Sequence, residues 1–255
     1  MEVFLNPDAW IALVTLTFLE IVLGIDNIIF ISIATGKLPE EKRKKATKLG
    51  MFLAMFMRIA LLFGINLLIQ MKEPWFHIDL SWFSAGITGQ SIILLLGGLF
   101  LIYKSTNEIR EKVDEKGHEE KEMKEAATKS FQNVILQIIM IDLVFSFDSI
   151  LTAVGMTNGV EGAIYIMITA VIISVFIMMQ FAVPVGNFVN KHPSIQILGL
   201  AFLILIGMML LTESAHLSNA LIFGSHVTPL PKGYLYFAIT FSLVVEMINM
   251  KIKKK

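Results

Sequence analysis

Apolar residues are distributed along the chain in a way that predicts seven membrane-spanning helices. A helix needs about 20 apolar residues to cross a bilayer, because each residue adds about 1.5 Å. Seven stretches are long enough, and they lie near residues 9–35, 49–70, 88–104, 131–156, 162–183, 195–212 and 233–250. The pattern therefore predicts an all-α polytopic membrane protein.

Two segments between the spans have a different pattern. Residues 71–86 are interrupted by charge but contain Trp75, Phe76, Trp82 and Phe83, which is typical of a segment at the headgroup level of a membrane. Residues 105–129 are strongly polar with mixed charges and no apolar periodicity. We expect them to form a solvated helix or a flexible linker between two halves of the chain.

Composition supports the membrane assignment and excludes several classes of protein. Hydrophobic residues make up 55% of the chain and charged residues 16%, whereas soluble domains carry about 25% charged residues. The formal net charge is zero, which argues against a nucleic-acid partner. The absence of cysteine excludes disulfides and thiolate metal ligands. The N-terminus lacks the basic start of a cleavable signal peptide.

Positive charges predict the orientation in the membrane. With seven spans and an external N-terminus, 18 of the 21 lysines and arginines fall on the cytoplasmic side. Only Lys72 and Lys232 fall outside, and Arg58 lies within the second span. Cytoplasmic loops are enriched in lysine and arginine. We therefore predict a multi-pass protein of the bacterial cytoplasmic membrane with its N-terminus outside and its C-terminus inside.

The first and fourth predicted spans share a motif of two acids followed by a small polar residue. Aligning LEIVLGIDNIIF with IDLVFSFDSILT pairs Glu20 with Asp142, Asp26 with Asp148 and Asn27 with Ser149. The two copies are three spans apart, which is an odd offset, so they enter the membrane in opposite directions. This predicts a 3+3 inverted repeat, with a site between its halves. Within a single domain over 7–250, the first repeat covers about 9–104, the linker 105–129, the second repeat about 131–212 and the last helix about 233–250.

Ionisable groups inside a membrane are costly and by default mark an ion pathway or a paired site. The four acids with Asn27 and Ser149 form an all-oxygen set, which suits hard divalent cations such as Mn²⁺, Mg²⁺ or Ca²⁺. The two acids of each pair are about 120° apart on a regular helix, so a bend at Gly24 or Ser146 would help them reach one cavity. Arg58 could neutralise one acid, and Gln137 could line the same cavity.

The segments around these acids, together with PKGYLYFAITFSLVVEMIN, resemble the TerC family of bacterial membrane proteins over nearly the whole chain. That family, first named for tellurium resistance, belongs to the lysine-exporter superfamily. The resemblance implies two inverted three-helix units and export of manganese. It places Glu20, Asp26, Asn27, Asp142, Asp148 and Ser149 at the family's motif positions. The loop at 214–231 departs from the family in being longer.

We expect a secondary transporter, driven by protons or sodium, and no organic cofactor. No nucleotide-binding loop of the GxxxxGK[ST] type is present, so ATP is not expected to drive transport. An enzyme is not expected, because the acids lack the YD and GxGD pattern of intramembrane aspartyl hydrolases. Two alternatives stay open. One is a non-transporting partner of secretion or tellurite-resistance machinery with a structural ion. The other is amino-acid export, for which Arg58 is the only candidate cation. The sequence does not decide whether the protein forms a homo-oligomer.

Overall fold

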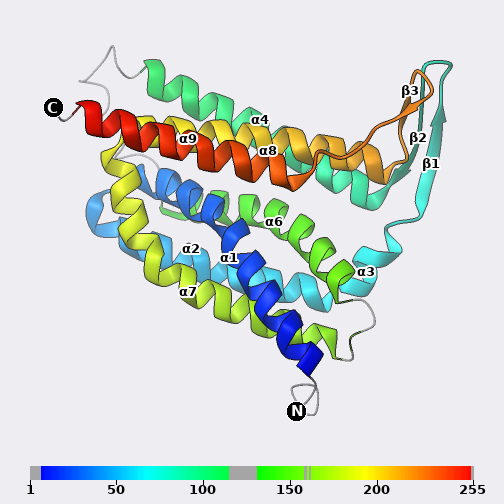
Figure 1. Cartoon of the computed structure of the whole chain (residues 1–255), viewed down its shortest axis with the longest axis horizontal. Coiled ribbons are helices and arrows are strands. Elements are labelled where there is room, and N and C mark those ends of the chain that lie inside the picture. The colour runs from blue at the N-terminus through cyan, green and yellow to red at the C-terminus, as the bar shows by residue number, and fades with distance from the viewer. Residues whose placement is uncertain (1–6, 115–130, 158–159, 161, 254–255) are drawn as a thin grey trace. The chain divides into compact units, whose positions relative to one another are not determined.

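A computed structural model describes residues 7–114, 131–157, 160 and 162–253. Its helices are α1 (Pro7–Gly36), α2 (Glu40–Phe63), α3 (Ile65–Gln70), α4 (Gly89–Asp114), α6 (Phe131–Met156), α7 (Ala163–Lys191), α8 (Pro193–Leu217) and α9 (Lys232–Lys253) (Figure 1). Within the described residues, seven of them are long and apolar enough to cross a membrane. The prediction of an all-α polytopic membrane protein is confirmed.

The second predicted span differs from the structure because it is not one helix. The sequence predicted 49–70, but α2 begins at Glu40 and ends at Phe63, and the short α3 follows. Gly64 separates the two, and its N–H donates to the carbonyl of Ala60. Glycine is among the weakest helix formers, so a helix often ends at such a residue. Five basic residues between the first two predicted spans therefore belong to the first turns of α2: Lys42, Arg43, Lys44, Lys45 and Lys48.

The predicted linker at 105–129 begins as a helix. α4 continues to Asp114, and both Ser105 and Glu108 are buried on it. Lys104 forms an ion pair with Glu108 one helical turn away, at 3.0 Å. This part of the segment is therefore a helix with one buried face, and its other face, including Arg110 and Asp114, is exposed. Residues 115–129 lie outside the described residues.

The aromatic segment between α3 and α4 forms a β-hairpin, which the sequence did not predict. β1 (Pro74–Asp79) pairs antiparallel with β2 (Phe83–Thr88). The loop after α8 adds β3 (Leu221–Ile222) and β4 (Ser225–His226), giving the order β1-β2-β3-β4 (Figure 1). Nearly every residue of β1 is exposed, so no alternation of buried and exposed positions marked this strand. The long loop at 214–231 thus completes a sheet.

The chain divides into two compact units, with the boundary inside α3. Unit 1 is built on α1, α2, α6 and α7. Unit 2 is built on α4, α8, α9 and the sheet. Each unit therefore takes helices from both predicted repeats. In unit 1, α1 packs mainly on α7 while α2 packs mainly on α6. A two-fold relation that exchanged α1 with α6 and α2 with α7 would convert one of these contacts into the other. The inverted repeat itself stays a prediction.

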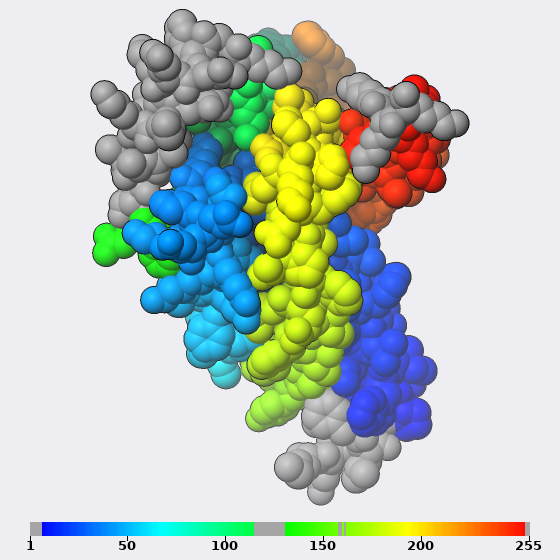
Figure 2. Space-filling view, turned by 90° about the vertical axis from the view of Figure 1, so that its left-hand side faces the viewer, coloured from blue at the N-terminus to red at the C-terminus, as the bar shows by residue number. Residues whose placement is uncertain are grey.

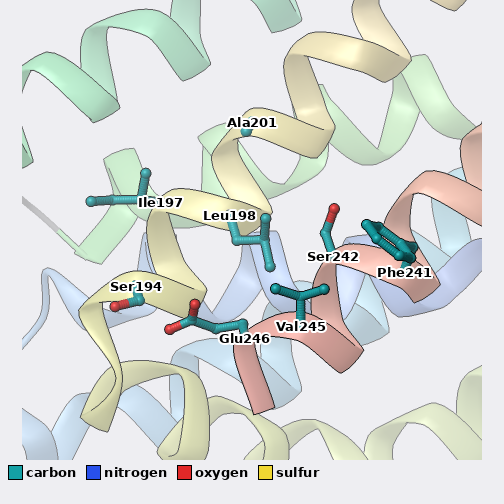
Figure 3. Close-up of a pocket in the computed structure, with 8 residues that line it drawn as sticks. All are labelled: Ser194, Ile197, Leu198, Ala201, Phe241, Ser242, Val245 and Glu246. Carbon is teal, nitrogen blue, oxygen red and sulfur yellow. The ribbon is translucent and has the colours of Figure 1, made fainter. Parts of the chain in front are cut away.

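Helix α9 is the least buried of the long helices. In unit 2 it packs on α8, and a groove of about 340 Å³ lies between them (Figure 3). Ser194 of α8 and Glu246 of α9 line this groove. Most large apolar side chains of α9, such as Phe237 and Phe241, are exposed. The last helix is therefore apolar on the side that its own unit leaves uncovered.

Candidate functional site

Three buried charged side chains meet in the interior of unit 1. Arg58 of α2 forms an ion pair through Nη1 with Glu20 of α1, and through Nη2 with Asp142 of α6, the second at 3.1 Å. The exposed fraction is 3% for Arg58 and 6% for each acid. Glu20 and Asp142 are the residues that the repeat alignment pairs as the first acids. Sequence reasoning assigned Arg58 to one acid, whereas it contacts two.

Helical spacing explains why the polar groups converge here. On α1 the buried positions Glu20, Gly24 and Asn27 follow a spacing of four and then three residues, which keeps them on one face. On α6 the buried positions Asp142, Ser146 and Ser149 repeat that spacing. Arg58 lies on the buried face of α2 with Met51, Ala54, Met55 and Leu62. One inward-facing stripe on each helix therefore carries the site.

Asp142 accepts more hydrogen bonds than Glu20. Asn27 donates from Nδ2 to Asp142 Oδ1 at 3.1 Å, and Ser146 donates from Oγ to Oδ2 at 3.0 Å. Gly24 occupies the position in α1 that Ser146 occupies in α6, and it supplies no hydroxyl. The side chain of Met178 of α7 packs against the Cα atom of Gly24, in the place that a Cβ atom would take. We call Glu20, Arg58, Asp142, Asn27 and Ser146 the Arg58 cluster.

The cluster leaves a buried oxygen without a hydrogen bond. Among the described residues, the side-chain oxygen Oδ1 of Asn27 has no donor, although the Asn27 side chain is 93% buried. The hydroxyl of Thr17 and the amide nitrogen Nε2 of Gln137 are likewise without partners in the described part of the chain. A buried polar atom without a partner costs about 1–3 kcal/mol, so such atoms often mark a place for water or an ion.

The second acid of each pair lies outside the Arg58 cluster. Asp26 is buried, and its carboxylate has no hydrogen-bond or ion-pair partner among the described residues. Asp148 is half-buried, and Thr152 donates to its backbone carbonyl at 3.0 Å. Ser149 is buried, but its hydroxyl donates to the carbonyl of Ser146 in its own helix. Over the described ranges, no three His, Cys, Asp or Glu side chains are grouped closely enough to hold a metal ion. The predicted six-residue ligand set therefore stays a prediction.

The charges of the cluster do not balance when both acids are ionised. A guanidinium stays protonated in proteins, so Arg58 supplies one positive charge. Glu20 and Asp142 would supply two negative charges. Burial makes an uncompensated charge expensive. The cluster therefore has capacity for one more positive charge, as a proton or as a cation.

Comparison with known proteins identifies the family of this arrangement. The chain matches the description "Integral membrane protein TerC family" over residues 5–255. The chain belongs to the TerC family. It is 46% identical to a UPF0053 protein of Haemophilus influenzae over 249 residues, which cover 98% of this chain and 96% of that protein. The UPF0053 inner membrane protein YgdQ of Escherichia coli K12 is also 46% identical, with the same coverage over 250 residues.

A longer relative contains the same region. The UPF0053 inner membrane protein YoaE of Escherichia coli K12 is 41% identical over 250 residues, covering 98% of this chain and 44% of that protein. The TerC-family part is thus one segment of YoaE and nearly all of YgdQ. No solved structure matches this chain. The resemblance to the TerC family that the motifs indicated is confirmed.

Sequence reasoning missed two polar features of unit 1 in this TerC-family chain, namely the hydrogen bond of Ser146 within the Arg58 cluster and the buried hydroxyl of Thr17 on the same face of α1 as Glu20. Ser146 was considered as a place for the helix to bend, but in the structure its hydroxyl donates to Asp142. Thr17 was not considered, although it precedes Glu20 by one turn on the same helix face. The spacing of Thr17, Glu20, Gly24 and Asn27 is the signal that would have found it.

Proposed function

We propose that this TerC-family protein is a secondary transporter of the bacterial inner membrane. Its cargo is a divalent cation, Mn²⁺ first among them, which passes through the Arg58 cluster and leaves the cell in exchange for protons or sodium. Placement in the inner membrane is supported by the names of YgdQ and YoaE. The outward direction and the preference for Mn²⁺ follow from the family resemblance.

The observation that carries the proposal is that Arg58 joins two buried carboxylates from different helices. A guanidinium between Glu20 and Asp142 is a tethered cation at a place where an incoming cation would find two carboxylate ligands. When the guanidinium withdraws from one acid, that acid becomes available to metal or to a proton. The guanidinium of Arg58 and an incoming cation exclude each other from the carboxylates. The site therefore has two states of different charge, which an exchanger requires.

The donor set favours a hard cation. Glu20, Asp142 and the side-chain oxygen of Asn27 are all oxygen donors, and Mn²⁺, Mg²⁺ and Ca²⁺ prefer oxygen. Asn27 already donates its amide nitrogen to Asp142, so its Oδ1 atom is turned away from that bond and stays available. Asp26, adjacent to Asn27 in sequence, is a buried carboxylate that could join this set after a change in helix packing.

Transport into proteoliposomes containing the purified full chain tests the proposal. We expect Mn²⁺ uptake by the wild-type protein, and we expect Glu20→Gln and Asp142→Asn each to lower the initial rate at least about tenfold. Each variant removes a charge and a ligand oxygen together. Imposing a proton gradient and a sodium gradient in separate experiments identifies the coupling ion.

A matched control removes an acid outside unit 1. Asp79 is exposed on β1, so Asp79→Asn is expected to transport at the wild-type rate. Uptake by Glu20→Gln and Asp142→Asn at the wild-type rate would show that the Arg58 cluster is not the transport site. Size-exclusion profiles of the variants separate a lost site from a lost fold.

A structural role is the second candidate, and one observation favours it. Arg58 already pairs with both acids, and the described residues hold no group of three potential metal-ligating His, Cys, Asp or Glu side chains. The cluster would then fasten three helices of a membrane protein that serves another machinery. In that case proteoliposomes move no Mn²⁺ under any gradient, while Arg58→Gln still lowers the melting temperature. Amino-acid export is less favoured, because Arg58 is already engaged by carboxylates of its own chain.

A further inference from the structure

The first turns of α2 present lysines and apolar side chains on one face. Lys44 and Lys48 are four residues apart, and Phe52 follows four residues after Lys48, so the three form a continuous stripe. Lys45 and Leu49 lie beside it with the same spacing. The opposite face of these turns is buried in unit 1 through Ala46, Thr47 and Gly50. The stripe is therefore the outward face of a helix whose inner face is fixed.

A groove follows this stripe between α2 and α7. It has a volume of about 620 Å³ and is lined by Glu41, Lys44, Lys45, Lys48, Leu49, Phe52 and Met179. Figure 2 shows α2 in blue and α7 in yellow beside each other on this face. Basic groups therefore line the groove along the first turns of α2, and the apolar side chains of Leu49, Phe52 and Met179 also line it.

The described residues do not neutralise the lysines of the groove. All three are exposed, and none has an ion-pair partner among the residues that the structure describes. Glu41 is the one acid of the lining, so the groove carries a net charge of about +2 at neutral pH. An occupant with negative charge would complement it.

We propose that this groove binds an anionic phospholipid, with its phosphate at Lys44, Lys45 and Lys48 and an acyl chain along Phe52 and Met179. Basic pockets between membrane helices recognise anionic headgroups by this combination of charge and apolar lining. The site is separate from the Arg58 cluster, so the proposal does not depend on cation transport.

The dimensions of α2 match those of a lipid at the membrane surface. Lys44 and Phe52 are eight residues apart, which is about 12 Å along a helix axis. The headgroup region of one leaflet is about 5–8 Å thick, so a helix passes from headgroups into hydrocarbon over this distance. Lysine stems also cover apolar surface while the ammonium groups stay at the headgroup level. An acidic protein segment would satisfy the lysines but would leave Phe52 and Met179 without an apolar partner.

Native mass spectrometry of the full chain in detergent tests the proposal. The protein is titrated with dioleoyl phosphatidylglycerol and, separately, with dioleoyl phosphatidylcholine. We expect one phosphatidylglycerol to bind at least about tenfold more tightly than phosphatidylcholine. In Lys44→Gln/Lys48→Gln we expect phosphatidylglycerol affinity to fall about 25-fold, since each lysine near an anionic lipid contributes about fivefold. Phosphatidylcholine affinity is expected to stay unchanged.

A matched pair of lysines provides the control. Lys191 ends α7 and Lys251 lies near the end of α9, and both are exposed. Lys191→Gln/Lys251→Gln removes the same charge and is expected to keep wild-type affinity for phosphatidylglycerol. Lys45→Glu, at an exposed position without an ion pair among the described residues, changes the charge of the groove by the same −2 as the double variant, so it is expected to fold normally and to lower phosphatidylglycerol affinity by a similar factor.

Three outcomes would overturn the proposal. One is equal affinity of the wild-type protein for the two lipids. Another is an equal loss of phosphatidylglycerol in the Lys191→Gln/Lys251→Gln variant, which would indicate a general effect of net charge. The third is an unchanged affinity of Lys45→Glu for phosphatidylglycerol, which would indicate that the groove binds an acidic protein segment or a neutral lipid instead.

Discussion

Unit 1 and unit 2 hold their central helices together by opposite means. In unit 2, α4 and α8 approach closely at two glycines: a Cβ built on Gly98 would lie 2.7 Å from the carbonyl oxygen of Gly207. A neutral hydrogen bond from Ser214 to the carbonyl of Ser91, at 2.6 Å, adds to this contact. In unit 1, α1, α2 and α6 instead meet at Arg58 and two carboxylates.

The contrast concerns where the charges act: the buried Glu108 of α4 pairs with Lys104 of its own helix, whereas Arg58 joins acids of two other helices. Small residues and neutral hydrogen bonds suffice to associate helices in lipid, as α4 and α8 illustrate. Apolar residues of similar volume often stabilise a buried site as well as a charged group does. The proposed function assigns the three charges of unit 1 a task beyond holding helices together. Four predictions test this contrast.

The largest expected effect comes from removing Arg58. In Arg58→Gln the acids Glu20 and Asp142 lose their common partner, and breaking a buried ion pair costs about 3–5 kcal/mol. We expect a large drop in the melting temperature of the purified protein. Combining Arg58→Gln with Glu20→Gln should restore part of the lost melting temperature, because fewer unpaired charges remain. A wild-type melting temperature in Arg58→Gln would remove the distinction between the units.

The next effect concerns the close contact of unit 2. Gly98→Ala places a methyl group against a backbone carbonyl of α8, so the helices must separate, at a cost of about 1–3 kcal/mol. Thermal unfolding, monitored by circular dichroism, measures this loss of stability. Gly233→Ala is the control, because a Cβ there meets nothing within 4 Å. Equal stability of the two variants would show that α4 and α8 do not depend on the glycine contact.

A smaller effect is expected from Ser146→Ala. The variant removes one of the donors to Asp142, and a hydrogen bond to a charged group contributes about 1.5–3 kcal/mol at most. We expect a loss near the lower end, because Arg58 and Asn27 still donate to Asp142. In the control Ser149→Ala the lost hydroxyl served only a carbonyl of its own helix, so a smaller shift in melting temperature is expected. A larger shift in the control would contradict this assignment.

The smallest effect is expected at the surface of α4. Arg110 and Asp114 form an exposed ion pair at 3.5 Å, one helical turn apart. Such pairs contribute about 0.3–0.5 kcal/mol, so Arg110→Gln should change the melting temperature little. Comparing the melting temperatures of Arg110→Gln and Arg58→Gln contrasts two arginines that differ mainly in burial. Similar losses in both would mean that burial does not determine the contribution of an arginine here.

The sequence predicted those features that depend on a single helix by itself. Apolar runs located the spans, and the paired acids located the two helices that carry the candidate site. The end of α2 at Gly64 is a local effect, but it was hidden within a continuous apolar run. β1 was missed because its residues are nearly all exposed, and β3 because it is two residues long.

What the sequence could not predict depends on how helices pack. The double contact of Arg58 requires the rotation of three helices about their axes, which no single pattern specifies. The repeat alignment treated the two acids of each pair alike. In the structure Glu20 and Asp142 face Arg58, while Asp26, about 120° further around the helix, has no described partner. That Asp26 and Asp148 belong to the same ligand set stays a prediction.

The position of Arg58 in the chain has a consequence for biosynthesis. Glu20 and Arg58 belong to α1 and α2, so their ion pair needs only these two neighbouring helices to have been synthesised. Asp142 follows Arg58 by 84 residues, or about 4–17 s of translation at about 5–20 residues per second. We expect the nascent hairpin to carry the Glu20–Arg58 pair into the lipid during that interval. The third charge is added only when α6 has been inserted.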